Sequence, residues 1–533
     1  MPVAFRPEHV ATRPLAGLAA LLGLRATDAQ RAGARAGLTG VTHDSRTVRP
    51  GDLYAALPGT TVHGARFCAD AAAAGAVAVL TDPAGRRAGV ASGLPVFVVA
   101  DPRARLGEVA AWIYGEPSDR LLLVGVTGTA GKTTTSYLVE SGLKAAGYQT
   151  GLIGGVETRI GEQTQDSSLT TPEATDLQAL LAAMVQRRVG AAAMEVSSHA
   201  LALGRVAGTH YEVAVFTNLS QDHLDFHASM DEYFAVKAAL FTPRYARAGV
   251  ISIDDERGRE LAAQAAIPVT TFSAHGSHTA DWRATDVRPG ADGATFRVIG
   301  PGGVAADAAV ALPGDFNVAN ALAAIVALVE AGVGLADAVA GVAASPGPPG
   351  RLERVDRGQD FTVLVDYAHK PGAVEALLGA MRPVTQGSLV IVIGCGGDRD
   401  QGKRRLMGAA AARLADVAIL TSDNPRSEDP LAILAEMLAG AVDVPQRERA
   451  HVLVLPDRAA AIEAAIGPAG KGDVVLIAGK GHEHGQYVAG SVIPFDDREV
   501  AAAILQRRVR DGGNGRLAAG NQGNGTATLL ADA

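Results

Sequence analysis

A chain of 533 residues is long enough for about three or four domains at roughly 150 residues each. Its 48% hydrophobic and 20% charged residues, with 63 Gly and 26 Pro, exclude collagen-like, mucin-like and wholly disordered proteins. The net charge of −8 provides no overall positive field for nucleic acid or polyphosphates, and 4% aromatic residues are few for stacking single-stranded bases. We therefore expect no nucleic-acid partner, and any anionic ligand must be held by local groups.

The chain has only two cysteines, Cys68 and Cys395. Two thiols are too few for a disulfide framework or a four-cysteine zinc site, which favours a reducing compartment. The apolar run 14–24 is much shorter than a membrane span and lacks the features of a secretion signal. We expect a cytoplasmic protein with no membrane insertion.

Residues 1–117 predict a small α/β domain. Strand-like runs at 53–57, 76–80 and 95–100 are separated by Gly, Pro and Asp turn signals.

A second domain, 118–345, begins with the apolar run 121–126, which is typical of a strand buried on both faces of a sheet. A glycine-rich turn follows, and then a helical pattern over 133–146. Further strand-like runs alternate with helical stretches, so we predict a doubly wound parallel sheet. These runs are 190–196, 213–219 and 249–253.

The turn-rich segment Ser345–Gly350 predicts a linker, after which the pattern restarts as a third, Rossmann-like α/β domain over 346–510. Its predicted strands are 361–365, 389–393, 417–420, 452–455 and 474–477. Residues 511–533 are rich in Gly, Asn and Ala, have little to bury, and predict a disordered tail.

The strongest chemical signal is the motif Gly-Thr-Ala-Gly-Lys-Thr-Thr at 128–134, between an apolar run and a predicted helix. Such a turn lets backbone N–H groups surround phosphate oxygens, with Lys132 reaching the β- and γ-phosphates and the Thr133 hydroxyl a Mg²⁺ ion. Val126 stands where a strict phosphate loop has glycine, which disfavours motor and signalling NTPases. The predicted ATP-binding residues here are Gly128, Thr129, Ala130, Gly131, Lys132, Thr133 and Thr134.

Two segments after predicted strands carry groups suited to a metal. Glu195 follows the run 191–194 and is placed to act as the acidic partner of the loop. Asp222, His223 and Asp225 lie within one turn of each other. They predict either a metal or water-positioning cluster or a set of helix caps, and the residues alone leave both open.

Five motifs in this order resemble the Mur ligase family, the ATP-dependent enzymes that add amino acids to the peptidoglycan precursor. They are Gly-Thr-x-Gly-Lys-Thr-Thr at 128–134, Glu-Val-Ser-Ser-His at 195–199, Asp-His-Leu-Asp at 222–225, Gly-Asp-Phe-Asn-x-x-Asn at 314–320 and Asp-Tyr-Ala-His at 366–369. The resemblance covers roughly residues 40 to 500.

The resemblance implies that the γ-phosphate of ATP is transferred to a carboxylate and that an amine then attacks the acyl phosphate. Lys132 and Mg²⁺ at Thr133, Glu195 and His223 would neutralise charge. Lys237 matches the family lysine that is carbamylated by carbon dioxide, which would make it a further metal ligand. The implied catalytic residues are thus Lys132, Lys237 and His223.

Other nucleotide contacts also come from the resemblance. Asn317 and, less firmly, Asn320 are implied for adenine and ribose, Arg351 for a phosphate, and Asp366 for the next nucleotide-facing segment, which continues to His369. Lys370 stands where many relatives have Thr, and its role stays open.

Asp423-Asn-Pro-Arg426 resembles the motif of the branch that adds meso-diaminopimelate. The chemistry fits, because diaminopimelate has one more carboxylate than lysine and a guanidinium can bind a carboxylate in bidentate fashion. By resemblance, the amino-acid-binding residues are Arg399, Asp423, Asn424, Pro425, Arg426, Gly479 and Glu483.

The first domain is expected to bind the uridine diphosphate end of the other substrate. Two positions depart from relatives: Leu203 replaces a common Gln, and Leu169 is a similar change. The implied contacts are Ser45, Thr60, Thr61, Val62, Thr170, Thr171, Ser197 and Arg205.

The expected activity is ATP-dependent addition of meso-diaminopimelate to a UDP-N-acetylmuramoyl-L-alanyl-D-glutamate substrate by a monomer. An L-lysine-adding enzyme and a folylpolyglutamate synthase-like ligase are the alternatives. A different class would be a protein that uses ATP as a regulatory switch, but such a switch needs no acceptor pocket around Glu195, His223 and Lys237.

Overall fold

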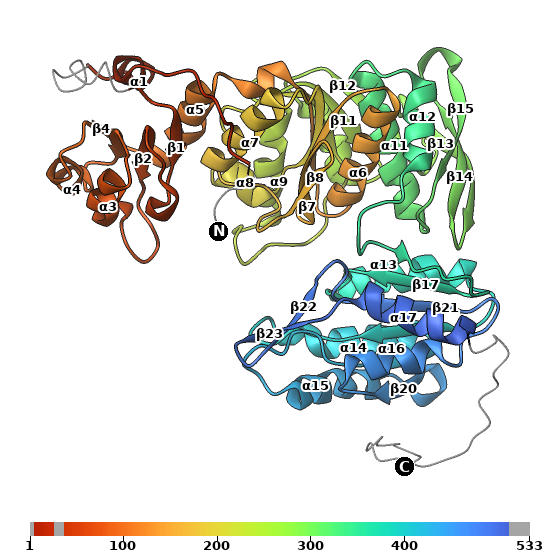
Figure 1. Ribbon diagram of the computed structural model, residues 1–533. Coiled ribbons are helices and arrows are strands. Elements are labelled where there is room, and N and C mark those ends of the chain that lie inside the picture. The colour runs from red at the N-terminus through yellow and green to blue at the C-terminus, as the bar shows by residue number, and fades with distance from the viewer. Residues whose placement is uncertain (1–4, 26–36, 511–533) are drawn as a thin grey trace. The chain divides into compact units, whose positions relative to one another are not determined.

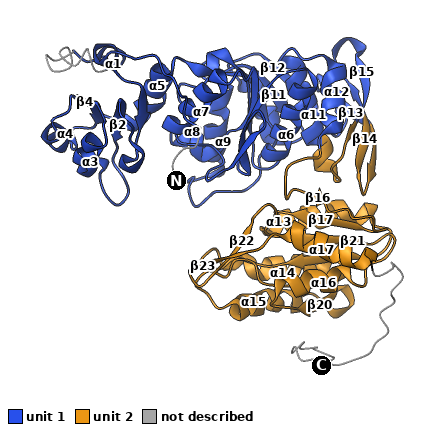
Figure 2. Cartoon of the chain, viewed as in Figure 1, with its two compact units in different colours: residues 1–285, 297–308, 319–345 blue, residues 286–296, 309–318, 346–533 orange. Residues whose placement is uncertain are grey.

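The computed structural model describes residues 5–25 and 37–510, and Figure 1 labels its elements. The predicted tail 511–533 lies outside the described residues. The chain divides into two compact units, coloured in Figure 2. The first comprises residues 1–285, 297–308 and 319–345, and the second comprises 286–296, 309–318 and 346–533.

The first unit begins with a four-stranded parallel sheet in the order β1-β2-β3-β4. The strands are β1 (Gly40–Thr42), β2 (Asp52–Ala56), β3 (Ala78–Thr81) and β4 (Val96–Val98). The helices are α1 (Leu15–Leu21), α3 (Cys68–Ala73), α4 (Arg86–Ala91) and α5 (Pro102–Tyr114). The predicted runs 53–57, 76–80 and 95–100 overlap β2, β3 and β4, whereas β1 was not predicted.

An eleven-stranded sheet follows, in the order β15-β14-β13-β12-β11-β10-β5-β9-β6-β7-β8. The strands from β12 to β6 in this order pair in parallel, and β6-β7-β8 pair antiparallel. The parallel strands are β5 (Leu122–Thr127), β6 (Thr150–Ile153), β9 (Ala191–Glu195), β10 (Tyr211–Phe216), β11 (Ala246–Ser252), β12 (Val269–Ser273) and β13 (Trp282–Gly290), which pairs with β12. The others are β7 (Glu157–Ile160), β8 (Gln163–Asp166), β14 (Gly293–Ile299) and β15 (Ala305–Val310).

The helices between these strands agree with the predicted alternation. The helix expected over 133–146 is α6 (Lys132–Ala145), and the runs 190–196, 213–219 and 249–253 correspond to β9, β10 and β11. The remaining helices are α7 (Ala174–Gln186), α8 (Ser198–Ala202), α9 (Met230–Ala238), α10 (Glu256–Gln264), α11 (Asp315–Glu330) and α12 (Leu335–Ala344).

The C-terminal sheet has six strands in the order β16-β17-β21-β18-β19-β20, all parallel except the short β16. Its strands are β16 (Glu353–Arg354), β17 (Thr362–Asp366), β18 (Leu389–Ile393), β19 (Val417–Leu420), β20 (His451–Val454) and β21 (Val474–Ala478). A separate hairpin is formed by β22 (Gly485–Val488) and β23 (Ser491–Pro494). The helices are α13 (Pro371–Met381), α14 (Gly402–Leu414), α15 (Pro430–Val442), α16 (Arg458–Ile466) and α17 (Asp497–Arg510).

These sheets and helices confirm the predicted α/β class. Buried apolar strands such as β5, β18 and β21 form the centres of the sheets, as their continuous apolar sequences indicate. The domain boundaries after residues 117 and 345 stay predictions. Within the described ranges, no helix is long and apolar enough to cross a bilayer.

Candidate active site

Three parallel strands of the first unit end side by side at the predicted nucleotide loop. Val126 of β5 pairs with Glu195 of β9 and with Val215 of β10. The segments that follow these strands therefore leave the same edge of the sheet, which is the edge where open α/β sheets bind ligands. The loop 128–131 and the segment 218–225 both begin there.

The loop between β5 and α6 turns at two glycines with left-handed backbone angles. The φ angle is 148° at Gly128 and 85° at Gly131. A Cβ atom at Gly128 would collide with the Thr217 hydroxyl, and one at Gly131 with Oδ1 of Asn320. Since Gly131 directly precedes α6, the first-turn N–H groups of this helix open toward the loop, as phosphate binding requires.

Asn218 holds this loop in place. Its carbonyl oxygen accepts a hydrogen bond of 2.9 Å from the Thr129 N–H, and its Oδ1 accepts one of 3.0 Å from the Ala130 N–H. The sequence reasoning gave Asn218 no role. The only signal for it was its position at the end of the predicted strand 213–219, shortly before the Asp-His-Leu-Asp motif at 222–225.

Two lysine ammonium groups converge on one carbonyl oxygen. The Nζ atoms of Lys132 and Lys237 each donate to the Gly128 oxygen over 2.8 Å. Lys237 is only 1% exposed, which is rare for a lysine. Burial and, secondarily, the charge of Lys132 hold the pKa of Lys237 well below its usual range. Lys237 therefore presents a neutral, nucleophilic amine at a lower pH than an exposed lysine.

Thr133 and Glu195 form a pair of oxygen donors suited to magnesium. The Thr133 hydroxyl donates to Oε2 of Glu195 over 2.9 Å, and Oε1 of Glu195 accepts from the Gly155 N–H over 2.8 Å. Among the described residues, no group of three or more His, Cys, Asp or Glu side chains is arranged to hold a metal. A Mg²⁺ ion fits such a sparse set, because it keeps waters and takes ligands from substrate phosphates.

His223 lies beside a carboxylate and other rings. Its Nε2 is 3.5 Å from Oδ2 of Asp222, and its ring centroid is 4.8 Å from that of His199. The alternative interpretation of this segment as helix caps fails for the next helix, because α9 begins at Met230 and is capped by Ser229. Lys237 lies in the last turn of that helix.

The predicted contacts for the sugar-peptide moiety gather around Glu195. The Thr171 hydroxyl donates to the Glu195 carbonyl over 2.9 Å and accepts from the Ser197 N–H over 3.1 Å. Arg205 donates to the Thr171 carbonyl over 3.4 Å and pairs with Glu173 at 2.9 Å. Thr170 lies one residue away, and Leu169 is 40% exposed. The residues Thr171, Ser197 and Arg205 are thus held together at this edge of the sheet.

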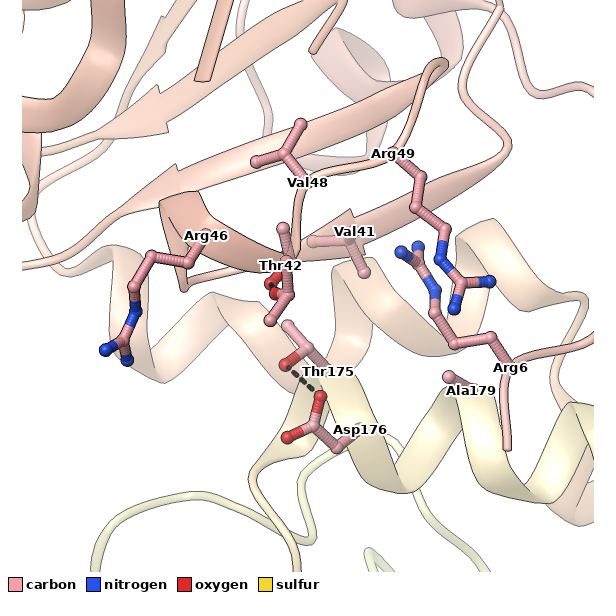
Figure 3. A pocket seen from close by; sticks show the side chains of 10 residues that line it. Arg6, Val41, Thr42, Arg46, Val48, Arg49, Thr175, Asp176 and Ala179 are labelled. Carbon is pink, nitrogen blue, oxygen red and sulfur yellow. Dashed lines mark hydrogen bonds between the residues drawn. The ribbon is translucent and has the colours of Figure 1, made fainter. Parts of the chain in front are cut away.

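In the first domain, Ser45 begins a short 3₁₀ helix (Ser45–Thr47), and Thr60, Thr61 and Val62 lie on an exposed loop after β2. A cavity of about 210 Å³ lies between the end of β1 and helix α7 (Figure 3). Figure 3 shows the guanidinium groups of Arg6 and Arg49 on one side of it and Arg46 on the other. The predicted residues Ser45 and Thr60–Val62 are not among those lining this cavity.

The predicted nucleotide residues of the second unit are buried or stacked. Burial raises the pKa of Asp366, although its two oxygens accept backbone N–H bonds from Leu352 at 2.9 Å and Ala368 at 2.7 Å. The Arg351 guanidinium lies 4.6 Å from the centre of the Tyr367 ring. Asn317 is 3% exposed and donates to the Pro313 carbonyl over 2.8 Å.

The Asp423–Arg426 loop follows β19 and is bound by the β22–β23 hairpin. The Arg426 N–H donates to the Tyr487 carbonyl over 2.8 Å, and the Arg426 carbonyl accepts from the Ala489 N–H over 2.7 Å. These bonds hold Arg426 at a φ of 54°, and its guanidinium donates to the Gly397 carbonyl over 2.6 Å. The hairpin was not predicted from the sequence.

Most of the other predicted amino-acid contacts lie around this loop. The Asn424 amide donates to Oε2 of Glu483 over 2.8 Å, and a Cβ atom at Gly479 would be 2.7 Å from Oδ2 of Asp423. Arg399 differs: it is exposed and donates to the neighbouring Asp398 carbonyl over 3.3 Å. Pro425 is part of the loop itself.

Two buried cations near this loop were missed by the sequence reasoning. Lys480 is fully buried and contacts both Asn424 and Glu483. Arg458 forms a buried ion pair with Asp497 and donates to the Ser422 and Ala478 carbonyls, next to the ends of β19 and β21. Lys480 directly follows Gly479, which the resemblance had implied, whereas nothing in the sequence around Arg458 indicated its position.

The chain belongs to the Mur ligase family. Three family models match it in succession: the Mur ligase family catalytic domain at residues 37–114, the Mur ligase middle domain at 126–328 and the Mur ligase glutamate ligase domain at 350–481. The matches cover the predicted nucleotide loop and the Asp423–Arg426 loop.

Within this family, the chain is most informatively compared with individual named relatives and with a solved structure. The chain is 59% identical over 502 residues to UDP-N-acetylmuramoyl-L-alanyl-D-glutamate–2,6-diaminopimelate ligase of Streptomyces coelicolor, covering 94% of this chain and 98% of the relative. It is 47% identical to the UDP-N-acetylmuramyl-tripeptide synthetase of Leifsonia xyli, covering 95% and 98%. A solved structure of a UDP-N-acetylmuramoyl-L-alanyl-D-glutamate–2,6-diaminopimelate ligase superposes with a TM-score of 0.69 at 32% identity, covering 94% of this chain and all of that one.

Proposed function

We propose that this Mur ligase uses ATP to join meso-diaminopimelate to UDP-N-acetylmuramoyl-L-alanyl-D-glutamate in peptidoglycan precursor synthesis. The observation that carries the proposal is the Asp423–Arg426 loop, which is held by the β22–β23 hairpin and by Glu483. The proposal is supported by the 59% identity to a relative named as a 2,6-diaminopimelate ligase. Arg426 offers a guanidinium for the additional carboxylate of the amino acid, and Asp423 and Glu483 offer charges for an amine.

The first step would make an acyl phosphate. An oxygen of the acceptor carboxylate attacks the γ-phosphorus, the bond between that phosphorus and the β-phosphate oxygen breaks, and ADP leaves. Lys132 and the N–H groups of Gly128 to Thr134 would hold the phosphates. Thr133, Glu195, His223 and carbamylated Lys237 would hold Mg²⁺, which when bound neutralises charge on the phosphates.

In the second step, the amine nitrogen attacks the acyl carbon, phosphate leaves, and the amine loses a proton. The charged groups around Asp423 and Arg426 would orient the amino acid for this attack.

The environment of Lys237 supports its carbamylation. The neutral amine would attack the carbon of carbon dioxide, form an N–C bond and release a proton, which replaces a buried amine by an anion. An anion there would be stabilised by the neighbouring Lys132, whereas two ammonium groups at the Gly128 oxygen repel one another.

The remaining assignments are also proposals. Asn317, Arg351 and Asp366 would contact the nucleotide. Ser45, Thr60, Thr61, Val62, Thr170, Thr171, Ser197 and Arg205 would bind the UDP-linked dipeptide. Arg399 and Gly479 would complete the amino-acid site. We further propose a cytoplasmic monomer with domains at 1–117, 118–345 and 346–510; the two cysteines are unpaired and buried, as expected in a reducing compartment.

Phosphate release by the purified protein tests the activity. We expect release only when ATP, Mg²⁺, the UDP-linked dipeptide and meso-diaminopimelate are all present, with kcat/KM for L-lysine lower by on the order of 10³ or more. Removing carbon dioxide from the buffers should lower the rate, and bicarbonate should restore it. Preference for L-lysine would contradict the amino-acid assignment, use of a folate acceptor would favour the folylpolyglutamate synthase alternative, and hydrolysis without an acceptor would favour a switch.

A further inference from the structure

Lys480 is a fully buried lysine that the proposed chemistry does not use. It lies between β21 and the β22–β23 hairpin, in the sequence Gly-Lys-Gly at 479–481. The φ angles of Gly479 and Gly481 are 113° and 55°, so the chain turns on both sides of the lysine. A Cβ atom at Gly481 would lie 2.8 Å from the Gly350 carbonyl oxygen, which leaves no room for a side chain there.

The Lys480 ammonium has three acceptors, one for each of its N–H groups. It donates to Oδ1 of Asn424 over 3.1 Å, to Oε2 of Glu483 over 3.0 Å and to the Gly485 carbonyl over 2.6 Å. These acceptors belong to the Asp423–Arg426 loop, the turn after β21 and the start of the hairpin. One side chain thus ties the Asp423–Arg426 loop to the turn and the hairpin start that follow β21, more than fifty residues further along the chain.

Lys480 also decides how the Asn424 amide points. An ammonium can only donate, so it holds the amide oxygen toward itself, and the Tyr487 N–H donates to the same oxygen over 3.1 Å. The amide nitrogen must then point the other way, toward Oε2 of Glu483 at 2.8 Å. Without Lys480, only the Tyr487 N–H would hold the amide oxygen away from the Glu483 carboxylate.

The charges around Lys480 match a zwitterionic ligand. Asp423 and Glu483 together carry two negative charges, and Lys480 neutralises one of them. One negative charge is left to receive an ammonium group, and Arg426, on the same loop, supplies a positive charge for a carboxylate. The Glu483 side chain is 30% exposed, so it can meet a ligand while Lys480 stays buried.

We infer that Lys480 is a positioning residue of the amino-acid site: directly and through the Asn424 amide, it fixes the Glu483 carboxylate so that this carboxylate receives the amine of the incoming amino acid. This inference rests on the proposed function, since it takes that site to bind an amino acid. A purely structural role is the competing explanation: removing one partner of a buried ion pair destabilises a protein, but it does not by itself raise the KM for one substrate alone.

Lys480→Met and Lys480→Gln separate these explanations. Met keeps the volume and removes every donor, whereas Gln keeps an NH₂ group that can donate to two acceptors. We expect the KM for meso-diaminopimelate to rise about tenfold or more in Lys480→Met and less in Lys480→Gln. The KM for ATP should change little, whereas the thermal unfolding midpoint falls in Lys480→Met because Asn424 and Glu483 lose a buried partner, so both KM values are measured well below that midpoint. Lys471→Met is the matched control, because Lys471 is exposed just before β21 and should leave all three quantities unchanged.

Equal rises in the KM for ATP and for the amino acid would overturn the inference. Equal rises in the amino-acid KM in Lys480→Met and Lys480→Gln, each with the same fall in the unfolding midpoint, would overturn it as well. An unchanged amino-acid KM in Lys480→Met would also overturn it. Failure of the proposed function is distinguishable, because it would appear in the wild type. If the wild type prefers L-lysine, the same variants measured with L-lysine still decide the role of Lys480.

Discussion

The nucleotide edge of the first unit and the amino-acid loop of the second both contain a buried lysine, but they treat its charge differently. At the nucleotide edge, Lys132 and Lys237 share the Gly128 carbonyl oxygen, and their positive charges oppose each other. At the amino-acid loop, Lys480 already has a carboxylate, an amide and a carbonyl as acceptors. The first region is suited to receive negative charge from phosphates and a carbamate, whereas the second is organised by the protein alone.

This difference indicates where each kind of specificity resides. Phosphoryl transfer needs charge neutralisation at the moment of reaction, and the negative phosphates of the substrate relieve the repulsion between cations that are held close together. Discrimination between amino acids needs donors and acceptors fixed before binding, so Asn424, Glu483 and Arg426 are held by bonds within the protein.

We expect the largest effect from a substitution at the nucleotide edge of the first unit. Lys132→Met removes the cation that would neutralise the β- and γ-phosphates, and we expect turnover to fall by about 10²–10³. Phosphate release under saturating substrates measures it. Lys144→Met on the same helix is the control, because Lys144 pairs with Glu140 away from the loop. A loss of less than about tenfold for Lys132→Met would mean that Lys132 does not neutralise charge on the phosphates.

A smaller effect is expected at the second region. Arg426→Asn removes the guanidinium but keeps a residue that tolerates a φ of 54°. We expect the KM for meso-diaminopimelate to rise about 10- to 100-fold, because a charge-assisted bond is lost, while the KM for ATP stays within about twofold. Arg405→Asn, at an exposed arginine paired with Asp443, should change neither constant. If Arg426→Asn raised the KM for ATP as much as the KM for meso-diaminopimelate, Arg426 would not be specific to the amino-acid site.

A third expected effect concerns the stability of the second unit in acid, where a half-buried histidine two residues after Lys480 is kept neutral. Burial and, secondarily, the Arg351 charge lower the pKa of His482 to about 4. Between pH 6.5 and pH 4 the unfolded chain binds a proton that the folded chain excludes, so this group makes the protein less stable as pH falls. His482→Gln should therefore reduce the acid sensitivity, by up to about 3 kcal/mol at pH 4.

Urea unfolding of His482→Gln and the wild type at several pH values measures this contribution. The two proteins should differ least above pH 7, where His482 is neutral in both states. Parallel stability curves down to pH 4 would show that His482 is not kept neutral by its surroundings.

Much of the fold could be predicted because its signals are local. Continuous apolar runs identified strands such as β5, β18 and β21, and the helix after the nucleotide loop was expected within one residue at each end. The strands β7 and β8 were missed, since β8 contains only polar residues and its pairing, not its composition, makes it a strand. The β22–β23 hairpin was missed although it holds the Asp423–Arg426 loop.

For the candidate site, too, some features could be predicted from the sequence and others appear only in the structure. The types of group and their order along the chain could be predicted from the motifs: a glycine turn before Lys132, an acid at Glu195, and an arginine at the end of Asp-Asn-Pro-Arg. The packed structure shows that Lys237 meets the Gly128 carbonyl, that Asn218 bonds to the nucleotide loop and that Lys480 is buried against the Asp423–Arg426 loop. The physical reason is that burial and hydrogen-bond partners depend on contacts between residues tens to more than a hundred positions apart, and these arise only when the sheets pack.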